Sequence, residues 1–172
     1  MAKRIIAIGG VPASGKTTLL RKIIKHTAPF TSFKFGLVRG MYSKEHNLYI
    51  IGIYNNSLFS GTDKLSMAVQ PHFFKFIDKI KDGTILFEGD RLFNQSLFDN
   101  YKCDINVIKV SDEVCYSRHK QRNDNQSEKF KKAKQTKIDN ILKNNNCNIY
   151  FNNTEQESDN IFNEIIKKIF CK

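Results

Sequence analysis

The sequence Gly10-Val11-Pro12-Ala13-Ser14-Gly15-Lys16-Thr17-Thr18 decides the fold of this chain. It follows an apolar run at residues 5–8, as a buried strand would, and it opens a helical pattern at residues 19–24. Its spacing fits G-x-x-x-x-G-K-[ST] between a strand and a helix. An ordinary glycine turn would not require the lysine and the threonine at these positions. The pair Gly9-Gly10 strengthens the prediction of a tight turn here.

The chemistry of this spacing favours a polyphosphate ligand. Glycines let successive backbone N–H groups turn inward around an anion, and the following helix presents its positive end to the same anion. Lys16 is expected to reach the β- and γ-phosphates, and the Thr17 hydroxyl to bind Mg²⁺. The sequence therefore predicts ATP and Mg²⁺ as cofactors, and it predicts that the nucleotide contacts Gly10, Ala13, Ser14, Gly15, Lys16, Thr17 and Thr18.

The length of 172 residues predicts a single α/β domain spanning residues 1–172. No apolar run approaches 18 residues and no signal-peptide pattern precedes the first strand, so we expect a cytoplasmic protein with no membrane contact. The cysteines lack zinc-site spacing and are expected to be reduced and structural: Cys103, Cys115, Cys147 and Cys171.

The charge balance is strongly basic. Lys and Arg number 28 against 17 Asp and Glu, which gives a formal net charge of +11. Such a balance favours polyanionic partners, either nucleic acid or highly phosphorylated substrates. An A·T-rich genome would also produce a lysine-rich chain, and this alternative stays open. The sequence does not determine the oligomeric state.

Strands and helices are predicted to alternate along the chain. The expected strands are residues 4–8, 33–39, 48–54, 84–88, 103–110 and 148–151, and the expected helices include 16–26, 66–81, 92–101 and 159–170, with a further helix beginning near Ser111. A polar turn at residues 43–47 favours a hairpin or an edge addition. The alternation predicts a parallel sheet covered on both faces, with ligands at the carboxyl ends of its strands.

Carboxylates suited to phosphoryl transfer lie at two places, the end of the predicted strand 84–88 and the loop that follows the predicted strand 48–54. Glu88 and Asp90 share one strand end, and we expect one of them to support Mg²⁺ and the other to orient the acceptor. Asp63, in a long glycine-containing loop, competes with both for the role of general base. The alternatives are a solvated acidic strand end for the pair and an Asx turn for Asp63.

Basic and amide side chains supply the other candidates. The acceptor side offers Thr62, Lys64 and Arg91, while Arg118 and Arg122 lie four apart on a predicted helix and are expected to close over ATP. They belong to a basic lid at about residues 115–143. Asn153, in the turn after the last strand, is a candidate contact for adenine. A solvated helix face and a plain turn are the alternatives.

With these residues placed, the chain resembles the P-loop kinase group that includes nucleoside-monophosphate, shikimate and gluconate kinases. The resemblance covers nearly the whole chain, and its one highly specific motif is the 10–18 loop. It implies a P-loop NTPase three-layer sandwich with a mainly five-stranded parallel sheet. It also implies a substrate-binding segment after the second strand and an arginine-bearing lid before the last one.

A narrower resemblance is carried by residues 61–71, 87–94 and 136–138. These segments are similar to bacteriophage P-loop kinases associated with hypermodified thymine, which are thought to phosphorylate 5-hydroxymethyluracil within DNA. This resemblance implies a DNA acceptor whose target base is flipped out of the duplex. It also implies that the basic lid grips the DNA backbone, and that Asp63, Glu88 or Asp90 activates the hydroxymethyl oxygen.

The acceptor side departs from the monophosphate kinases, which commonly carry a more regular arginine set. Only Lys64 and Arg91 are available there. The sequence therefore predicts an ATP-dependent kinase acting on a hydroxyl of a nucleic-acid-type acceptor. Two alternatives stay open: a kinase for free nucleotides or nucleosides, and a nucleotide-dependent binding or switch ATPase.

Overall fold

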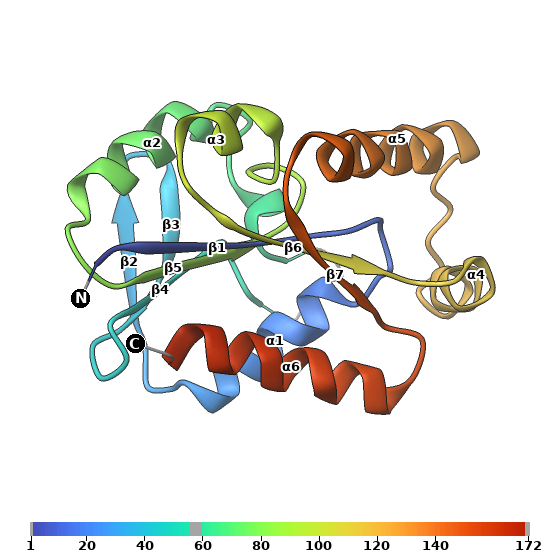
Figure 1. Ribbon diagram of the computed structural model, residues 1–172, viewed down its shortest axis with the longest axis horizontal. Coiled ribbons are helices and arrows are strands. Elements are labelled where there is room, and N and C mark those ends of the chain that lie inside the picture. Colours follow the sequence, from blue (N-terminus) through green and yellow to red (C-terminus); the bar gives the residue numbers. More distant parts are fainter. Residues whose placement is uncertain (1, 56–59, 171–172) are drawn as a thin grey trace.

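The computed structural model describes residues 2–55 and 60–170, which form an α/β fold around one sheet (Figure 1). The strands are β1 (Arg4–Gly9), β2 (Thr31–Phe35), β3 (Val38–Ser43), β4 (Leu48–Ile51), β5 (Thr84–Glu88), β6 (Asp104–Lys109) and β7 (Cys147–Phe151). The helices are α1 (Lys16–His26), α2 (Val69–Lys79), α3 (Gln95–Asn100), α4 (Asp112–Gln121), α5 (Glu128–Asn144) and α6 (Glu155–Phe170), with a short 3₁₀ turn η1 (Thr62–Lys64).

The sheet is mixed and has seven strands in the order β2-β3-β4-β5-β1-β6-β7. The strands β4, β5, β1, β6 and β7 pair in parallel, whereas β2 and β3 add an antiparallel hairpin at the β4 edge. The expectation of a mainly five-stranded parallel sheet was therefore wrong. The stretch 33–39 forms two strands instead of one, because the chain reverses at Gly36, whose φ of 57° suits glycine.

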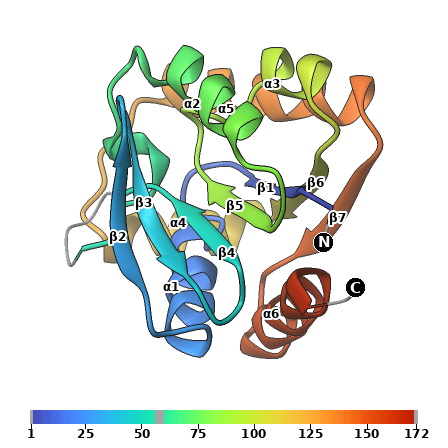
Figure 2. The same cartoon turned by 90° about the vertical axis from the view of Figure 1, so that its left-hand side faces the viewer.

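Helices cover both faces of the sheet, as expected. On one face α2, α3 and α5 pack on residues that include Ile5, Ile85 and Phe87. On the other face α1 and α6 pack on residues that include Ile6 and Leu86. Figure 2 shows these two helical layers on opposite sides of the strands. The alternation of Ile5 with Ile6 and of Ile85 with Leu86 follows from the two-residue period of a strand.

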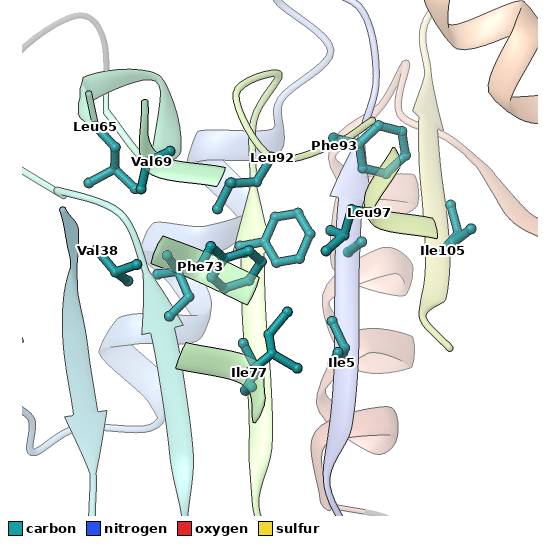
Figure 3. Packing of buried hydrophobic residues seen from close by; sticks show 14 of the residues in the cluster. Ile5, Val38, Leu65, Val69, Phe73, Ile77, Leu92, Phe93, Leu97 and Ile105 are labelled. Carbon is teal, nitrogen blue, oxygen red and sulfur yellow. The ribbon is translucent and has the colours of Figure 1, made fainter. Parts of the chain in front are cut away.

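The larger core is built on aromatic and branched side chains (Figure 3). Phe73 of α2 meets Phe87 of β5 edge to face, with ring centroids 5.5 Å apart. Ile138 and Ile141 of α5 belong to the same core. The last turns of the predicted lid segment are therefore anchored in the domain core.

Helix ends follow capping chemistry. The Ser111 hydroxyl accepts a hydrogen bond from the Val114 N–H at 3.4 Å, which confirms the helix start expected there. The last helix begins at Glu155, earlier than residue 159, because Thr154 accepts from the Glu157 N–H at 3.2 Å. Pro71 lies in the first turn of α2, where a missing N–H costs little.

The carboxyl ends of β1, β4 and β5 lie at one edge of the sheet, because these strands are parallel. The loops that follow them carry the 10–18 sequence, the segment around η1 and the acidic residues at 88–91. No described helix is both long and apolar enough to cross a membrane. Cys103, Cys115 and Cys147 are free thiols, as expected, and Cys171 lies outside the described residues.

Candidate functional site

The 10–18 loop closes around the ammonium group of Lys16. The Lys16 Nζ donates hydrogen bonds to the backbone oxygens of Gly10, at 2.8 Å, and Val11, at 2.9 Å. Gly10, Ala13 and Gly15 have φ values of 152°, 64° and 97°, and α1 begins directly after Gly15. The loop therefore forms a concave turn at a helix N-terminus, a geometry that suits anions.

Two side chains that are distant in the sequence hold the loop from outside. The Asn152 Nδ2 donates to the Ser14 backbone oxygen at 2.8 Å. The Arg118 guanidinium donates to the backbone oxygens of Ala13, at 3.2 Å, and Asn152, at 2.8 Å. A Cβ on Gly15 would lie 2.3 Å from the Asn152 Nδ2, so any other residue there would displace the Asn152 side chain. The loop is therefore braced by the ends of β7 and α4.

Gly15→Ala is expected to distort this loop. Alanine at a φ of 97° costs about 1–2 kcal/mol, and its methyl group would displace Asn152. We expect a loss of unfolding free energy of that size. We also expect roughly tenfold weaker binding of ATP, the ligand predicted from the sequence, measured by thermal unfolding and calorimetric titration. Gly83→Ala is the matched control, since Gly83 has a φ of 103° and precedes β5 at the opposite sheet edge. Equal ATP affinities for both variants would contradict this prediction.

Glu88 is a buried carboxylate at the centre of the site, with 2% of its surface exposed. The Thr17 hydroxyl donates to its Oε1 at 3.1 Å. Burial, opposed by the Lys16 charge and assisted by the Asp63 charge, raises the pKa of Glu88 to about 7. A Cβ on Gly61 would lie 2.2 Å from the Glu88 Oε1, so the acceptor-side loop approaches the carboxylate closely. Burial also disfavours the charged form of Lys16 and so lowers its pKa, and the nearby Glu88 charge partly offsets this effect.

The pair of Thr17 and Glu88 fits Mg²⁺ held together with a phosphate ligand. Both supply hard oxygen ligands, and their oxygens lie 3.1 Å apart. Across residues 2–55 and 60–170, no cluster of three or more His, Cys, Asp or Glu side chains forms a self-sufficient metal site. Mg²⁺ is commonly held by one or two protein groups, with substrate phosphates and water completing the shell. The donor set is therefore consistent with a metal that arrives with a nucleotide.

Asp90 is held by two lysines of α5. Its carboxylate is bound by Lys134 and by Lys137, whose Nζ lies 2.8 Å from Oδ1. Burial alone would raise the pKa of Asp90, but these two ammonium groups hold it below its usual value. A metal ion at Asp90 would therefore have to displace the lysines, and in this arrangement the carboxylate anchors α5 beside the site.

The predicted acceptor-binding residues have different environments. Thr62 is buried, and its hydroxyl donates to the Glu88 backbone oxygen at 2.8 Å, which fastens the 61–64 segment to the end of β5. Asp63 is exposed, and its Oδ1 accepts from the Arg91 N–H at 3.2 Å. The Lys64 Nζ donates to the Asn55 Oδ1 at 2.9 Å.

One cavity of about 610 Å³ joins most of these groups, and we call it the large cavity. Its wall has three parts: Gly10, Pro12, Ala13, Lys16 and Thr17 from the loop; Ser60, Asp63, Met67, Glu88, Asp90, Arg91 and Asn94 from the acceptor side; and Arg122, Asp124, Gln126, Phe130, Lys134 and Lys137 from the lid segment. The volume is in the range of small-molecule sites. The predicted residues outside this wall are Ser14, Gly15, Thr18, Thr62, Lys64, Arg118 and Asn153.

Sequence reasoning missed several groups of the site. The side chain that reaches the loop is Asn152, whereas the Asn153 Oδ1 accepts from the Ser111 N–H at 2.7 Å. The Tyr54 hydroxyl is buried without a hydrogen-bond partner among the described residues, and burial raises its pKa well above the usual value. Phe130 could have been recognised in the sequence as a candidate site residue, because it is an aromatic residue within a lysine-rich run.

No family model matches this chain, and no curated protein matches it either. The functional interpretation therefore depends on the geometry described above.

Proposed function

We propose that this protein is a P-loop kinase that transfers the γ-phosphoryl group of ATP to a hydroxyl of a nucleic-acid-type acceptor. The leading candidate for the acceptor is 5-hydroxymethyluracil in DNA. The observation that carries the proposal is the large cavity, whose wall combines Lys16 and Thr17 of the 10–18 loop with Glu88, Asp63 and the lid segment. Phosphoryl transfer needs such a combination, because it is catalysed mainly by positioning and by charge stabilisation.

On the donor side, Lys16 would exchange the backbone oxygens of Gly10 and Val11 for the β- and γ-phosphates. Thr17 and Glu88 would hold Mg²⁺, which supplies charge neutralisation to the phosphates. Arg122 lines the cavity and forms no ion pair with a described acidic residue, so its charge is available to the migrating phosphoryl group. Arg118 would act indirectly, by bracing the loop.

On the acceptor side, Asp63 would accept the proton. The acceptor oxygen forms a bond to the γ-phosphorus, the bond from that phosphorus to the β,γ-bridging oxygen breaks, and ADP leaves. The hydroxyl proton passes to Asp63, because its carboxylate lines the cavity and is exposed. Glu88 already binds the Thr17 hydroxyl and Asp90 already binds two ammonium groups.

The wall of the large cavity outside the 10–18 loop has the composition of a nucleobase pocket. Phe130 and Met67 are 41% and 84% exposed, although both are apolar, and both line the cavity. The Gln126 Oε1 is buried there without a hydrogen-bond partner among the described residues. A flipped base would stack on the Phe130 ring. This combination favours an acceptor that carries a base.

Phe130→Ala is expected to weaken acceptor binding by about tenfold, since base–aromatic stacking contributes about 1–3 kcal/mol. The change should raise the KM for the acceptor and leave the KM for ATP unchanged, in steady-state kinetics with each substrate varied in turn. Phe170→Ala is the matched control, because Phe170 is 40% exposed and its helix, α6, packs on the opposite face of the sheet. An unchanged acceptor KM for the Phe130 variant would argue against the base pocket.

The proposal is tested by incubating the protein with γ-labelled ATP and four acceptors in parallel. These are 5-hydroxymethyluracil DNA, ordinary DNA, free deoxynucleotides, and water alone. Label in the modified DNA is the expected result. Label in free nucleotides would replace the acceptor assignment with a mononucleotide kinase, and phosphate release without acceptor dependence would replace it with a switch ATPase.

A further inference from the structure

The hairpin of β2 and β3 carries two cations directly opposite each other. Lys34 and Arg39 are register partners in the antiparallel ladder, and both are exposed. Like charges at such positions destabilise a hairpin. Neither side chain forms an ion pair with an acidic residue in the part of the chain that the structure describes. The hairpin therefore keeps an uncompensated positive pair.

The two cations face away from the core. Phe33 and Phe35, on either side of Lys34, contact Phe76 of α2 with ring centroids 5.2 and 5.8 Å apart. Because side chains alternate along a strand, Lys34 points to the opposite face. The pair therefore belongs to the outward face of the hairpin. Figure 2 shows β2 and β3 at one edge of the sheet.

This outward face forms one wall of a second cavity, of about 230 Å³, which we call the hairpin cavity. Its lining contains three cations and no acidic residue: Lys34, Gly36, Leu37, Arg39, Ile53, Lys64, Leu65 and Ser66. The third cation, Lys64, is bonded to a neutral partner, the Asn55 Oδ1. The cavity is therefore suited to an anion, and a positive field of this kind attracts phosphate groups.

The hairpin cavity adjoins the proposed acceptor side of the large cavity. The segment 63–67 lies between them, with Asp63 and Met67 lining the large cavity and residues 64–66 lining the hairpin cavity. A ligand that crosses this segment would therefore enter both.

We propose that the hairpin cavity binds a backbone phosphate of the acceptor DNA strand whose target base occupies the large cavity. The inference rests on the proposed function and adds to it a second contact site for the strand. A polynucleotide carries phosphates on both sides of its target base, and so it can fill both cavities at once. The site thus favours a strand over a free mononucleotide.

The test uses Lys34→Gln/Arg39→Gln, with Lys25→Gln/Lys44→Gln as the matched control. Both control lysines are exposed, and the two variants change the net charge equally. Binding of labelled single-stranded 5-hydroxymethyluracil DNA is followed by fluorescence anisotropy at several salt concentrations without ATP. For the hairpin variant we expect roughly tenfold weaker binding at low salt. We also expect a salt slope shallower by about 0.7, since the loss of one phosphate contact on a single strand removes about that much.

Equal salt slopes for the hairpin variant and the control would overturn this inference, as would a wild-type protein that does not bind DNA. A parallel titration with a mononucleotide separates the sources of phosphate. If Lys34→Gln/Arg39→Gln weakens mononucleotide binding as much as it weakens DNA binding, the assignment to a strand is overturned. The binding experiment contains no ATP and so does not depend on phosphoryl transfer. If the salt slopes of the hairpin variant and the control differ but the labelling assay shows no phosphoryl transfer, the DNA site is supported and only the proposed function is refuted.

Discussion

Lys16→Ala is expected to lower the rate of phosphoryl transfer by at least about a hundredfold while the chain stays folded. The loss of one preorganised group that stabilises transition-state charge typically costs a factor of about 10²–10³. In the free protein, the Lys16 Nζ donates to the backbone oxygens of Gly10 and Val11 and to the Ser14 Oγ, all within its own loop, so its removal should lower the free energy of unfolding by only about 1 kcal/mol. The measurement is label transfer together with thermal unfolding.

The matched control for Lys16 is Lys25→Ala. Lys25 belongs to the same helix, α1, and is exposed. We expect this variant to transfer phosphate at the wild-type rate. A Lys16 variant that retains full turnover would refute the assignment of the 10–18 loop.

Glu88→Gln is expected to lower transfer on the order of a hundredfold and, at the same time, to stabilise the metal-free protein at pH 8. Glutamine keeps an oxygen that accepts from the Thr17 hydroxyl, so the fold should be retained. It removes a carboxylate that burial makes costly to ionise. The loss of activity and the gain in stability therefore have the same cause.

The pH dependence of stability follows from the pKa of Glu88, which burial raises from 4.5 to about 7. Between these values the folded chain holds a proton that the unfolded chain has released. The unfolding free energy of the wild type should therefore fall as the pH rises from about 4.5 to 7, by roughly 3 kcal/mol in total, and this contribution should be constant above pH 7.

In Glu88→Gln this fall should be absent, as measured by urea unfolding in the presence of a chelator. Glu113→Gln is the control, because Glu113 is exposed at the start of α4 and should leave the wild-type profile unchanged. If the unfolding free energy of the wild type instead rises by the same amount between pH 4.5 and 7, the raised pKa of the buried Glu88 carboxylate would be contradicted.

Local sequence patterns predicted β1, the loop and α1 well. The apolar run fixes β1, the glycines at 10 and 15 permit the turn, and α1 begins at Lys16 as expected. Glu88 could also be placed, since it ends an apolar strand and such a strand is buried with its carboxyl end facing the site. These features depend on residues that are close in sequence.

The hairpin or edge addition expected from the 43–47 turn is present as the antiparallel β3–β4 pair. The reversal at Gly36 was missed, because residues 33–39 read as one continuous strand. Features that depend on long-range contacts could not be predicted. The sequence offers Asp90 and Glu88 as equivalent carboxylates at one strand end. Only the fold shows that Lys134 and Lys137 bind Asp90. Asn152 and Asn153 are neighbours, and strand geometry alone determines which of them reaches the loop.

The most direct test of the account is a crystal structure with Mg²⁺ and a non-hydrolysable ATP analogue. We predict that the β- and γ-phosphates lie within about 3 Å of the Lys16 Nζ and of the backbone N–H groups of the 10–18 loop. We also predict that Mg²⁺ lies beside Thr17 and Glu88. A triphosphate bound elsewhere, or a Lys16 side chain turned toward solvent with the triphosphate present, would contradict the central claim.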